Sequence, residues 1–338
     1  MTGVAAARLS PRRPREGSVD IVAVGEPLVE LVAEEPGHLG EVTTFSRGWG
    51  GDTSTVVVAA ARLGATAGYV TRVGADEFGR SFISLWEREG VDASRITVDR
   101  GRATGVYFVG YDASDGGHRF TYYRRGSAAS RLGPQDLDPD YLGSSRVVHT
   151  SGITQVLSTS CRAAAEAAMR MARARGVTVS YDANVRPGLA SRRSLLEVFE
   201  ASLPTVDIVF ASDEDLTHLY GMTEADPLVD RFLDLGPSIV VVKRGSAGAR
   251  VVSREDGTAD VPGLQVAAVD TTGAGDAFDA GFLISWLAGD SITDACRFAN
   301  AVGALTSCGR GAVASVPTRE QVEHFLLEQA AARITEDP

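Results

Sequence analysis

The sequence predicts an α/β fold in which helices cover both faces of a parallel sheet and a small β-sheet forms a lid. Three observations support this: apolar segments alternate with amphipathic ones, the apolar segments are nearly continuous, and two regions break the rhythm. Continuous apolar strands are typical of parallel sheets that are buried on both faces. The chain has 338 residues, 44% hydrophobic and 23% charged, which suffices for one large domain with an appendage.

Six apolar segments are predicted strands of the parallel sheet, and five longer segments are predicted helices. The strands are residues 19–26, 67–73, 146–150, 177–181, 207–211 and 238–242. The helices are residues 78–89, 160–175, 276–287, 293–307 and 318–332. Glycines directly after several of these helices favour the same boundaries.

The two departures from this rhythm lie at residues 28–45 and 104–125. The first contains short alternating segments around a proline–glycine pair, and the second reads TGVYFVGYDASDGGHRFTYYRR, two alternating strands around a turn. The DGG sequence in that turn is a hairpin signal. We expect both regions to form a lid that excludes water, because stray water would hydrolyse a nucleotide. A decorative edge hairpin is the alternative.

The remaining composition bounds the class of protein. Residues 1–18 are rich in Arg, Pro and small residues and predict a disordered leader, which leaves 19–332 as the folded domain. No segment is apolar enough to span a membrane, and 33 Lys plus Arg against 44 Asp plus Glu argue against nucleic-acid or membrane partners. Cys161, Cys296 and Cys308 form no disulfide framework or metal pair, so we expect buried apolar cysteines in a reducing cytoplasm.

The most informative segment is DTTGAGDAF at residues 270–278, which leads into an apolar-periodic helix. The first turn of a helix has unpaired N–H groups and a partial positive charge. Because Gly273 and Gly275 lack a Cβ atom, backbone amides around Gly273, Ala274 and Gly275 can approach phosphate oxygens closely. Asp276 can then take the proton from a hydroxyl that attacks a phosphoryl group. By itself GxGD is only a loop and a helix start; this context favours phosphoryl transfer.

Other phosphate-binding patterns do not fit the sequence. No GxxxxGK[ST] occurs, which argues against a Walker-type NTPase. The GAG at 273–275 lacks the third glycine of a dinucleotide fingerprint and lies late in the chain. A dinucleotide-dependent oxidoreductase and a non-catalytic sugar sensor remain as alternatives of other classes.

These motifs resemble those of the ribokinase-like (phosphofructokinase-B) carbohydrate kinases. The resemblance covers residue 19 to about residue 328 and rests on Gly50-Gly51 with AAARLG at 59–64, and on DTTGAGDAF. It implies a Rossmann-like α/β domain with a β lid, and transfer of the ATP γ-phosphoryl group to a primary hydroxyl of a small sugar or sugar acid. It also implies Mg²⁺ bound mainly through nucleotide and water, without a protein cage. Alternation in the lid strands leaves an apolar face, which predicts a homodimer or higher oligomer through the lids.

Within the family the chain is most similar to 2-keto-3-deoxygluconate kinases, through GEPLVELVAEEPGHLG, HTSGIT and YDANVRPGL. The resemblance implies that six residues contact the sugar acid: Gly51, Tyr107, Tyr122, Arg124, Ile153 and Arg186. Arginine suits a carboxylate because its planar fork donates two parallel hydrogen bonds. Fructokinase, ribokinase and other ketose kinases are the nearest alternatives.

The resemblance also implies five contacts to ATP: Ser212, Lys243, Gly245, Asn300 and Ala304. A solvated strand-end lysine is the alternative for Lys243, whereas an amide in mid-helix is mildly unfavourable without a partner, which favours a role for Asn300. Two residues depart from the family pattern. Thr55 stands where the family usually has Asn, which leaves the exact sugar open. Asp215 stands where the Asn-x-x-Glu motif ends in Glu, which shortens a charged arm near metal or phosphate.

Overall fold

The computed structural model describes residues 9–13, 17–111, 118–221 and 226–336. Within the predicted leader, Arg12 donates hydrogen bonds to the carbonyl oxygens of Gly143 and Ser145 at 3.0 and 3.3 Å. Residues 1–8 and 14–16 of that leader lie outside the described residues, as does the predicted hairpin turn at 112–117.

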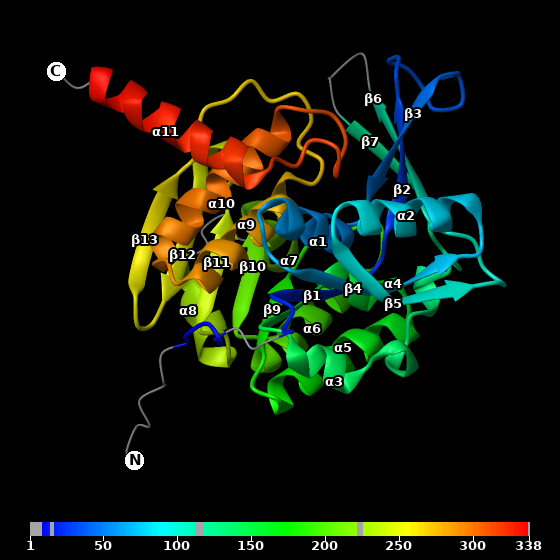
Figure 1. Ribbon diagram of the computed structural model, residues 1–338, viewed down its shortest axis with the longest axis horizontal. Coiled ribbons are helices and arrows are strands. Elements are labelled where there is room, and N and C mark those ends of the chain that lie inside the picture. The colour runs from blue at the N-terminus through cyan, green and yellow to red at the C-terminus, as the bar shows by residue number, and fades with distance from the viewer. Residues whose placement is uncertain (1–8, 14–16, 112–117, 222–225, 337–338) are drawn as a thin grey trace.

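A nine-stranded sheet forms the centre of the molecule, in the order β13-β12-β11-β10-β9-β8-β1-β4-β5 (Figure 1). The seven parallel strands are β1 (Ile21–Val24), β4 (Ala67–Gly74), β5 (Val91–Asp99), β8 (Val147–Ser151), β9 (Thr178–Asp182), β10 (Ile208–Ser212) and β11 (Ile239–Lys243). The antiparallel edge consists of β12 (Gly248–Ser253) and β13 (Gly257–Pro262). The predicted parallel sheet is therefore confirmed, with β5, β12 and β13 as strands that the pattern did not predict.

Helices cover both faces of this sheet, and Figure 1 shows α1 and α2 on one side of β1, β4 and β5 and α3 and α5 on the other. The first layer contains α1 (Asp52–Arg62), α2 (Glu77–Arg88), α9 (Ala274–Ala288) and α10 (Ile292–Ser307), with α11 (Arg319–Glu336) against it. The second contains α3 (Pro139–Ser144), α4 (Gly152–Leu157), α5 (Thr159–Ala174), α6 (Arg192–Ser202), α7 (Asp213–Tyr220) and α8 (Asp226–Leu235).

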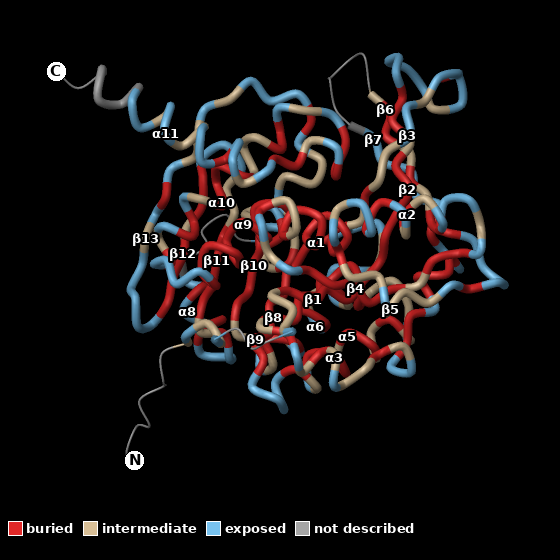
Figure 2. The backbone as a smooth tube through the Cα atoms, in the orientation of Figure 1, coloured by how far each residue is buried: buried red, intermediate tan, exposed pale blue. Residues whose placement is uncertain are grey.

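Strand β1 shows why the predicted strands read as continuous apolar runs. Ile21 and Ala23 belong to the core under the first helix layer, whereas Val22 and Val24 belong to the core under the second. All four side chains are fully buried, and Figure 2 shows the same burial along the central strands. A strand with two covered faces has no polar side to alternate with.

The lid is a separate four-stranded sheet in the order β3-β2-β6-β7. Its strands are β2 (Leu28–Ala33), β3 (Phe45–Gly50), β6 (Val106–Tyr111) and β7 (His118–Tyr123). Strands β2 and β6 pair in parallel, and the two outer pairs are antiparallel. The α/β fold with a small second sheet is thus confirmed, and β3 carries the lid directly into the start of α1.

Two further sequence expectations meet the structure here. The expectation that all three cysteines are buried is wrong for Cys308, which is exposed because it caps the end of α10 where the chain leaves the core. Over the described ranges, no helix is long and apolar enough to cross a membrane.

Candidate active site

The parallel strands end at one edge of the sheet, and polar side chains lie at the ends of four neighbouring strands. Strand β8 ends at Ser151, β9 at Asp182, β10 at Ser212 and β11 at Lys243. Helix α1 begins after Gly51 and helix α9 after Gly273. The carboxyl edge of an open parallel sheet is the usual place for a ligand site, and the predicted catalytic and sugar-binding residues gather around it.

Helix α9 begins with backbone amides that are free to bind an anion. Gly273 has φ of 78°, and a Cβ atom there would lie 2.7 Å from the carbonyl oxygen of Ala312, so only glycine fits. No side chain caps the helix, and Ala274 N donates to the carbonyl of Thr271 at 3.1 Å. The described part of the chain provides no acceptor for the amides of Gly275 and Asp276. These two amides and the helix dipole form a site suited to a phosphoryl oxygen.

Asp276 lies half-buried in the first turn of α9, at the end of this anion site. Burial and the charges of Asp52 and Asp182 raise its pKa to about 7, against the opposing effect of the Lys243 and Arg186 cations. A carboxylate that titrates near neutrality is well matched to general-base catalysis.

Asn184 fixes the orientation of this carboxylate, a role that sequence reasoning missed. Its Nδ2 donates to Asp276 Oδ1 at 3.3 Å, and its backbone N–H donates to Asp182 Oδ1 at 3.3 Å. With φ of 35°, Asn184 is the one non-glycine among the described residues in the left-handed region. Such strain is concentrated at functional sites. The available signal was a polar residue two positions after a strand end, within YDANVRPGL.

The sugar side of the site is built from buried carboxylates and their partners. Gly51 has φ of 98°, and a Cβ atom there would lie 2.3 Å from the carbonyl oxygen of Glu26. Arg124 forms a buried ion pair with Glu26, which also accepts a hydrogen bond from Ser127 Oγ at 3.2 Å. Burial raises the pKa of Glu26 although Arg124 opposes the shift. Asp52 accepts a hydrogen bond from Ser151 Oγ.

Two predicted tyrosines lie together on the lid. Tyr107 is buried and its ring stacks on Tyr122, with centroids 5.7 Å apart. Its hydroxyl donates to Glu30 Oε1 at 2.5 Å, and burial raises the pKa of Glu30 to about 7. A Cβ atom on Gly311 would lie 2.8 Å from Glu30 Oε2, and the backbone of Ala312, next to the start of α9, lowers the pKa of Glu30. The lid is therefore tied to the phosphate side of the site.

The other predicted sugar contacts flank this region. Ile153 is buried in α4, two residues after the Ser151 cap. Arg186 follows β9, is exposed, and donates from Nη1 to the carbonyl oxygen of Val185 at 3.1 Å. Thr55 is buried in α1 and its hydroxyl donates to the carbonyl of Gly51 at 2.9 Å. At the position where the family usually has an amide, this chain thus has a hydroxyl bonded within its own helix.

The five residues predicted to contact ATP differ from one another in burial and in hydrogen-bond partners. Ser212 and Lys243 are direct partners across β10 and β11, and Lys243 Nζ lies between two carboxylates. Gly245 is exposed and Ala304 half-buried. Asn300 donates from Nδ2 to the carbonyls of Val261 and Pro262 at 3.1 and 3.2 Å, so its amide fastens α10 to β13.

Asp215 is engaged with the backbone rather than facing an open space. Its two carboxylate oxygens accept from the amides of Ser212 and Val185 at 2.8 and 2.7 Å, and Ser212 Oγ accepts from Asp215 N in return. This capping box starts α7 and holds the segment that leads to Arg186.

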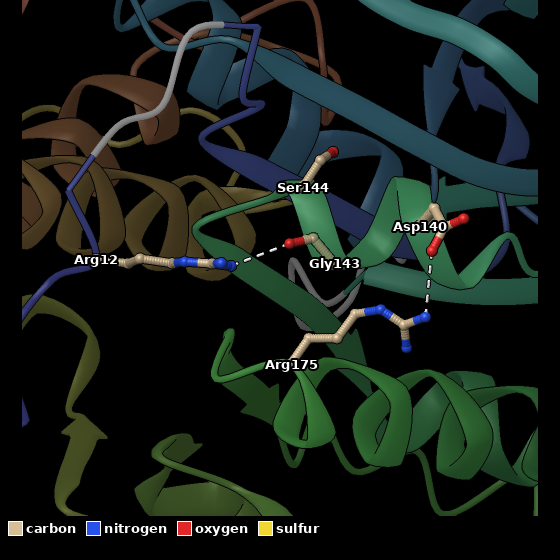
Figure 3. Close-up of a pocket in the computed structure, with 5 residues that line it drawn as sticks. All are labelled: Arg12, Asp140, Gly143, Ser144 and Arg175. Atoms are coloured by element: carbon tan, nitrogen blue, oxygen red, sulfur yellow. Dashed lines mark hydrogen bonds and ion pairs between the residues drawn. The ribbon is translucent and has the colours of Figure 1, made fainter.

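The site fits a nucleotide phosphate better than it fits a protein-bound metal. Among the residues with described positions, no group of three or more His, Cys, Asp or Glu is arranged to hold a metal ion. The glycine-lined start of α9 instead offers amides and a dipole to an anion. A surface hollow lined by Arg12, Asp140 and Arg175 lies elsewhere, next to the α3 end that leads into the amino end of β8 (Figure 3).

Fold and site together define a sugar-phosphorylating enzyme of the carbohydrate kinase type. The model of the pfkB family of carbohydrate kinases matches residues 19–319, and the chain belongs to this family. It is 36% identical to 2-dehydro-3-deoxygluconokinase of Thermoproteus tenax, over 93% of this chain and 96% of that protein. It is 34% identical to probable fructokinase-5 of Arabidopsis thaliana, over 92% and 98%. Among solved structures, a putative ribokinase II of E. coli in complex with ATP and Mg²⁺ matches with a TM-score of 0.85 and 27% identity, over 92% and 99%.

Proposed function

We propose that the protein transfers the γ-phosphoryl group of ATP to a primary hydroxyl of 2-keto-3-deoxygluconate. The observation that carries the choice of a sugar acid is Arg186. Arg186 is an exposed residue after β9, and within the described ranges no carboxylate forms an ion pair or a hydrogen bond with its guanidinium, whose Nη1 donates to the carbonyl of Val185. A substrate carboxylate can supply the missing bidentate partner. The similarity to 2-dehydro-3-deoxygluconokinase supports the same choice.

In the proposed reaction, Asp276 takes the proton of the attacking hydroxyl while Asn184 holds its carboxylate in place. The Gly275 and Asp276 amides stabilise the negative charge on the transferred group, aided by the α9 dipole. Mg²⁺, bound with the nucleotide, supplies neutralisation of the β- and γ-phosphate oxygens. Tyr107 and Tyr122 close the sugar side from the lid and exclude water.

The proposal is tested with a coupled kinase assay across sugars and sugar acids, with ATP and Mg²⁺ in excess. We expect turnover of 2-keto-3-deoxygluconate and a rise in its KM of tenfold or more in Arg186→Ala, because a charge-assisted pair is lost. Arg193→Ala, a change in an exposed pair on α6, serves as the control. Comparable turnover of fructose with negligible turnover of the keto-deoxy acid would contradict the choice of acceptor.

A neutral ketose such as fructose is the second candidate, and one observation favours it. Arg124, the other predicted contact for the acid, is already neutralised by Glu26 in a buried ion pair. Of the two arginines predicted to contact the acid, both within the described ranges, this leaves Arg186 to bind a carboxylate. If Arg186→Ala leaves the KM of fructose unchanged while fructose is the preferred acceptor, this second candidate replaces the first.

On the nucleotide side, we infer that ATP lies along the ends of β10 and β11. The five contacts in this proposal are Ser212, Lys243, Gly245, Asn300 and Ala304. The adjacent strand ends of Ser212 and Lys243 support it. Asn300 has the weakest support because its Nδ2 is committed to Val261 and Pro262.

We also infer that the protein works in the cytoplasm as a homodimer joined through the lids. The lid face opposite Tyr107 and Tyr122 exposes Tyr123 (68% exposed), whose ring contacts Phe108, which in turn contacts Phe45. Such a patch is suited to an isologous interface. Light scattering at micromolar concentration is expected to give a dimer mass for the wild type and a monomer mass for Tyr123→Glu. A monomeric wild type would rule out this interface.

A further inference from the structure

A cluster of three charged side chains lies directly behind the candidate active site. Lys243 Nζ, at the end of β11, donates to Asp182 Oδ2 at 2.9 Å and to Asp279 Oδ1 and Oδ2 at 3.0 and 3.2 Å. The side chains of Lys243, Asp182 and Asp279 are 13%, 3% and 0% exposed. Sequence reasoning singled out Lys243 but gave no role to either carboxylate.

The position of the cluster connects it to the reacting groups. Asp279 follows Asp276 by three residues on α9, so the two carboxylates lie on the same side of the helix. A Cβ atom placed on Gly275 would be 3.5 Å from Lys243 Nζ. The ammonium group therefore lies beneath the first turn of α9, next to the Gly275 and Asp276 amides that can donate to a phosphoryl oxygen.

A purely structural role would be to tie β11, β9 and α9 together. Ion clusters are a poor means to that end, because well-packed apolar residues of similar volume often give equal or greater stability. A structural role also does not explain why a lysine lies under the anion site.

We propose that Asp279 is a positioning residue that, with Asp182, holds the Lys243 ammonium beneath Gly275, where its charge assists phosphoryl transfer. The inference rests on the kinase activity proposed above but not on the identity of the sugar. Two acceptors, one from the sheet and one from the helix, fix the ammonium in a way that one cannot. The ordering of Lys243 is then complete before the nucleotide binds, which is the arrangement that electrostatic catalysis requires.

The charge balance of the cluster agrees with this role. Burial and the adjacent Asp182 charge raise the pKa of Asp279 well above its usual value. Burial opposes the ionisation of Asp182, but the Lys243 charge keeps the pKa of Asp182 below its usual value. The Lys243 cation thus offsets the charge of Asp182, and the raised pKa of Asp279 disfavours a second negative charge facing an incoming phosphate.

Lys243 also influences the base. Four charged groups face Asp276 from different elements: Asp52 from α1, Asp182 from β9, Arg186 from the segment after β9, and Lys243 from β11. The two carboxylates make Asp276 harder to ionise, and the two cations make it easier. If Asp279 is removed, Lys243 keeps only Asp182 and moves away from Gly275. Asp276 then ionises at higher pH.

The test compares Asp279→Ala, Asp279→Leu, which fills the vacated volume, and Asp279→Asn, which resembles the protonated acid in shape and hydrogen bonding. With whichever sugar the wild type phosphorylates, Asp279→Ala and Asp279→Leu are expected to lower kcat about tenfold and to move its acid limb to higher pH. Asp279→Asn is expected to remain within about threefold of the wild type, because its amide oxygen can still accept from Lys243 while its NH2 group can donate to Asp182. Ser285→Ala, a buried change at the far end of α9, is the matched control.

Two further measurements separate positioning from packing. In a Lys243→Met background, Asp279→Leu is expected to have no additional effect on kcat, since Asp279 acts through the lysine. Calorimetric titration with ATP and Mg²⁺, which needs no sugar, is expected to show affinity reduced about fivefold in Asp279→Leu. Independent effects of the two changes on kcat, or unaltered ATP affinity and pH profile in a folded Asp279→Leu protein, would overturn the inference. A wrong sugar would show only in the acceptor panel.

Discussion

The phosphate end and the sugar end of the site differ in how charged groups are stabilised there. At the phosphate end, the amides of Gly275 and Asp276 lie together in the first turn of α9. At the sugar end, each buried carboxylate has a partner from a distant part of the chain, as in Glu26 with Arg124. The first is a local device that a short motif can encode. The second is a product of tertiary structure, and it can vary between relatives without disturbing the first.

The largest effect is expected from Asp276→Asn, which removes the base but keeps the size of the side chain. We expect kcat to fall by about 10³-fold or more, the range of general-base catalysis combined with lost charge. The KM for ATP is expected to change little, because the backbone amides remain. The coupled assay measures both, with Asp294→Asn at the exposed start of α10 as the control. Retention of full phosphotransfer would rule out Asp276 as the base and favour a different catalytic group.

Gly273→Ala is expected to disrupt the anion site through backbone geometry. The added Cβ would lie 2.7 Å from the Ala312 carbonyl oxygen at φ of 78°, so the first turn of α9 must shift. We expect kcat to fall about 100-fold, as for loss of a preorganised oxyanion donor. Gly289→Ala, at the other end of α9, has φ of 99° with open space around it. This change tests the effect of backbone strain alone. An equal loss of activity in Gly289→Ala would contradict the role of Gly273 in the anion site.

These two predictions concern residues that could be identified from the sequence alone, because all of them lie in one short segment. The anion site is contiguous: Gly273 to Asp276 depend on one helix start and its dipole. Strand and helix periodicity likewise predicted the parallel sheet, since each strand carries its own apolar run. Glu30 and Tyr107, in contrast, are 77 residues apart and meet only because β2 and β6 pair in parallel register. No local pattern specifies that register.

The sugar end offers the corresponding test of long-range pairing. Arg124→Ala leaves Glu26 buried without its partner, so the free energy of unfolding is expected to fall by about 3 kcal/mol. Chemical denaturation measures this loss. The double change Arg124→Ala with Glu26→Gln is expected to recover part of the loss, because no buried charge is then left unpaired. Arg193→Ala in an exposed pair should change stability by less than about 1 kcal/mol. Equal effects of the two arginines would contradict a buried, functional pair.

A smaller effect is expected from pH. The pKa of Asp276 is raised to about 7 by burial and by Asp52 and Asp182, and only the ionised carboxylate accepts a proton. We therefore expect kcat/KM to fall about tenfold per pH unit below 7 and to level off above it. Asp52→Asn removes one of the two negative charges and should move this limb to lower pH. A limb that stays in place would show that Asp52 does not act on the base.

The smallest expected effect is on stability. The raised pKa of Asp276 that serves catalysis lowers the free energy of unfolding at neutral and alkaline pH. The folded pKa of Asp276, about 7, exceeds the usual carboxyl value of 3.8, so the folded protein holds this proton more tightly than the unfolded chain. Its contribution to stability is present below about pH 4 and is lost as the pH rises through 7. Asp276→Asn does not ionise, so at pH 8 it should be more stable than the wild type by about 1 kcal/mol, allowing for water at the half-buried carboxyl.

For a chain of this length such a gain corresponds to a rise in Tm of about 2 °C. Thermal unfolding at pH 8 and at pH 5 is expected to show a larger difference at the higher pH, because at pH 5 the wild type has lost only part of this contribution. A lower Tm for Asp276→Asn at pH 8 would mean that Lys243 and Arg186 outweigh the two carboxylates around the base. The charge of Asp276 would then be compensated by neighbouring cations, as the charge of Glu26 is by Arg124. The two ends of the site would differ only in how far apart in the sequence the interacting residues lie.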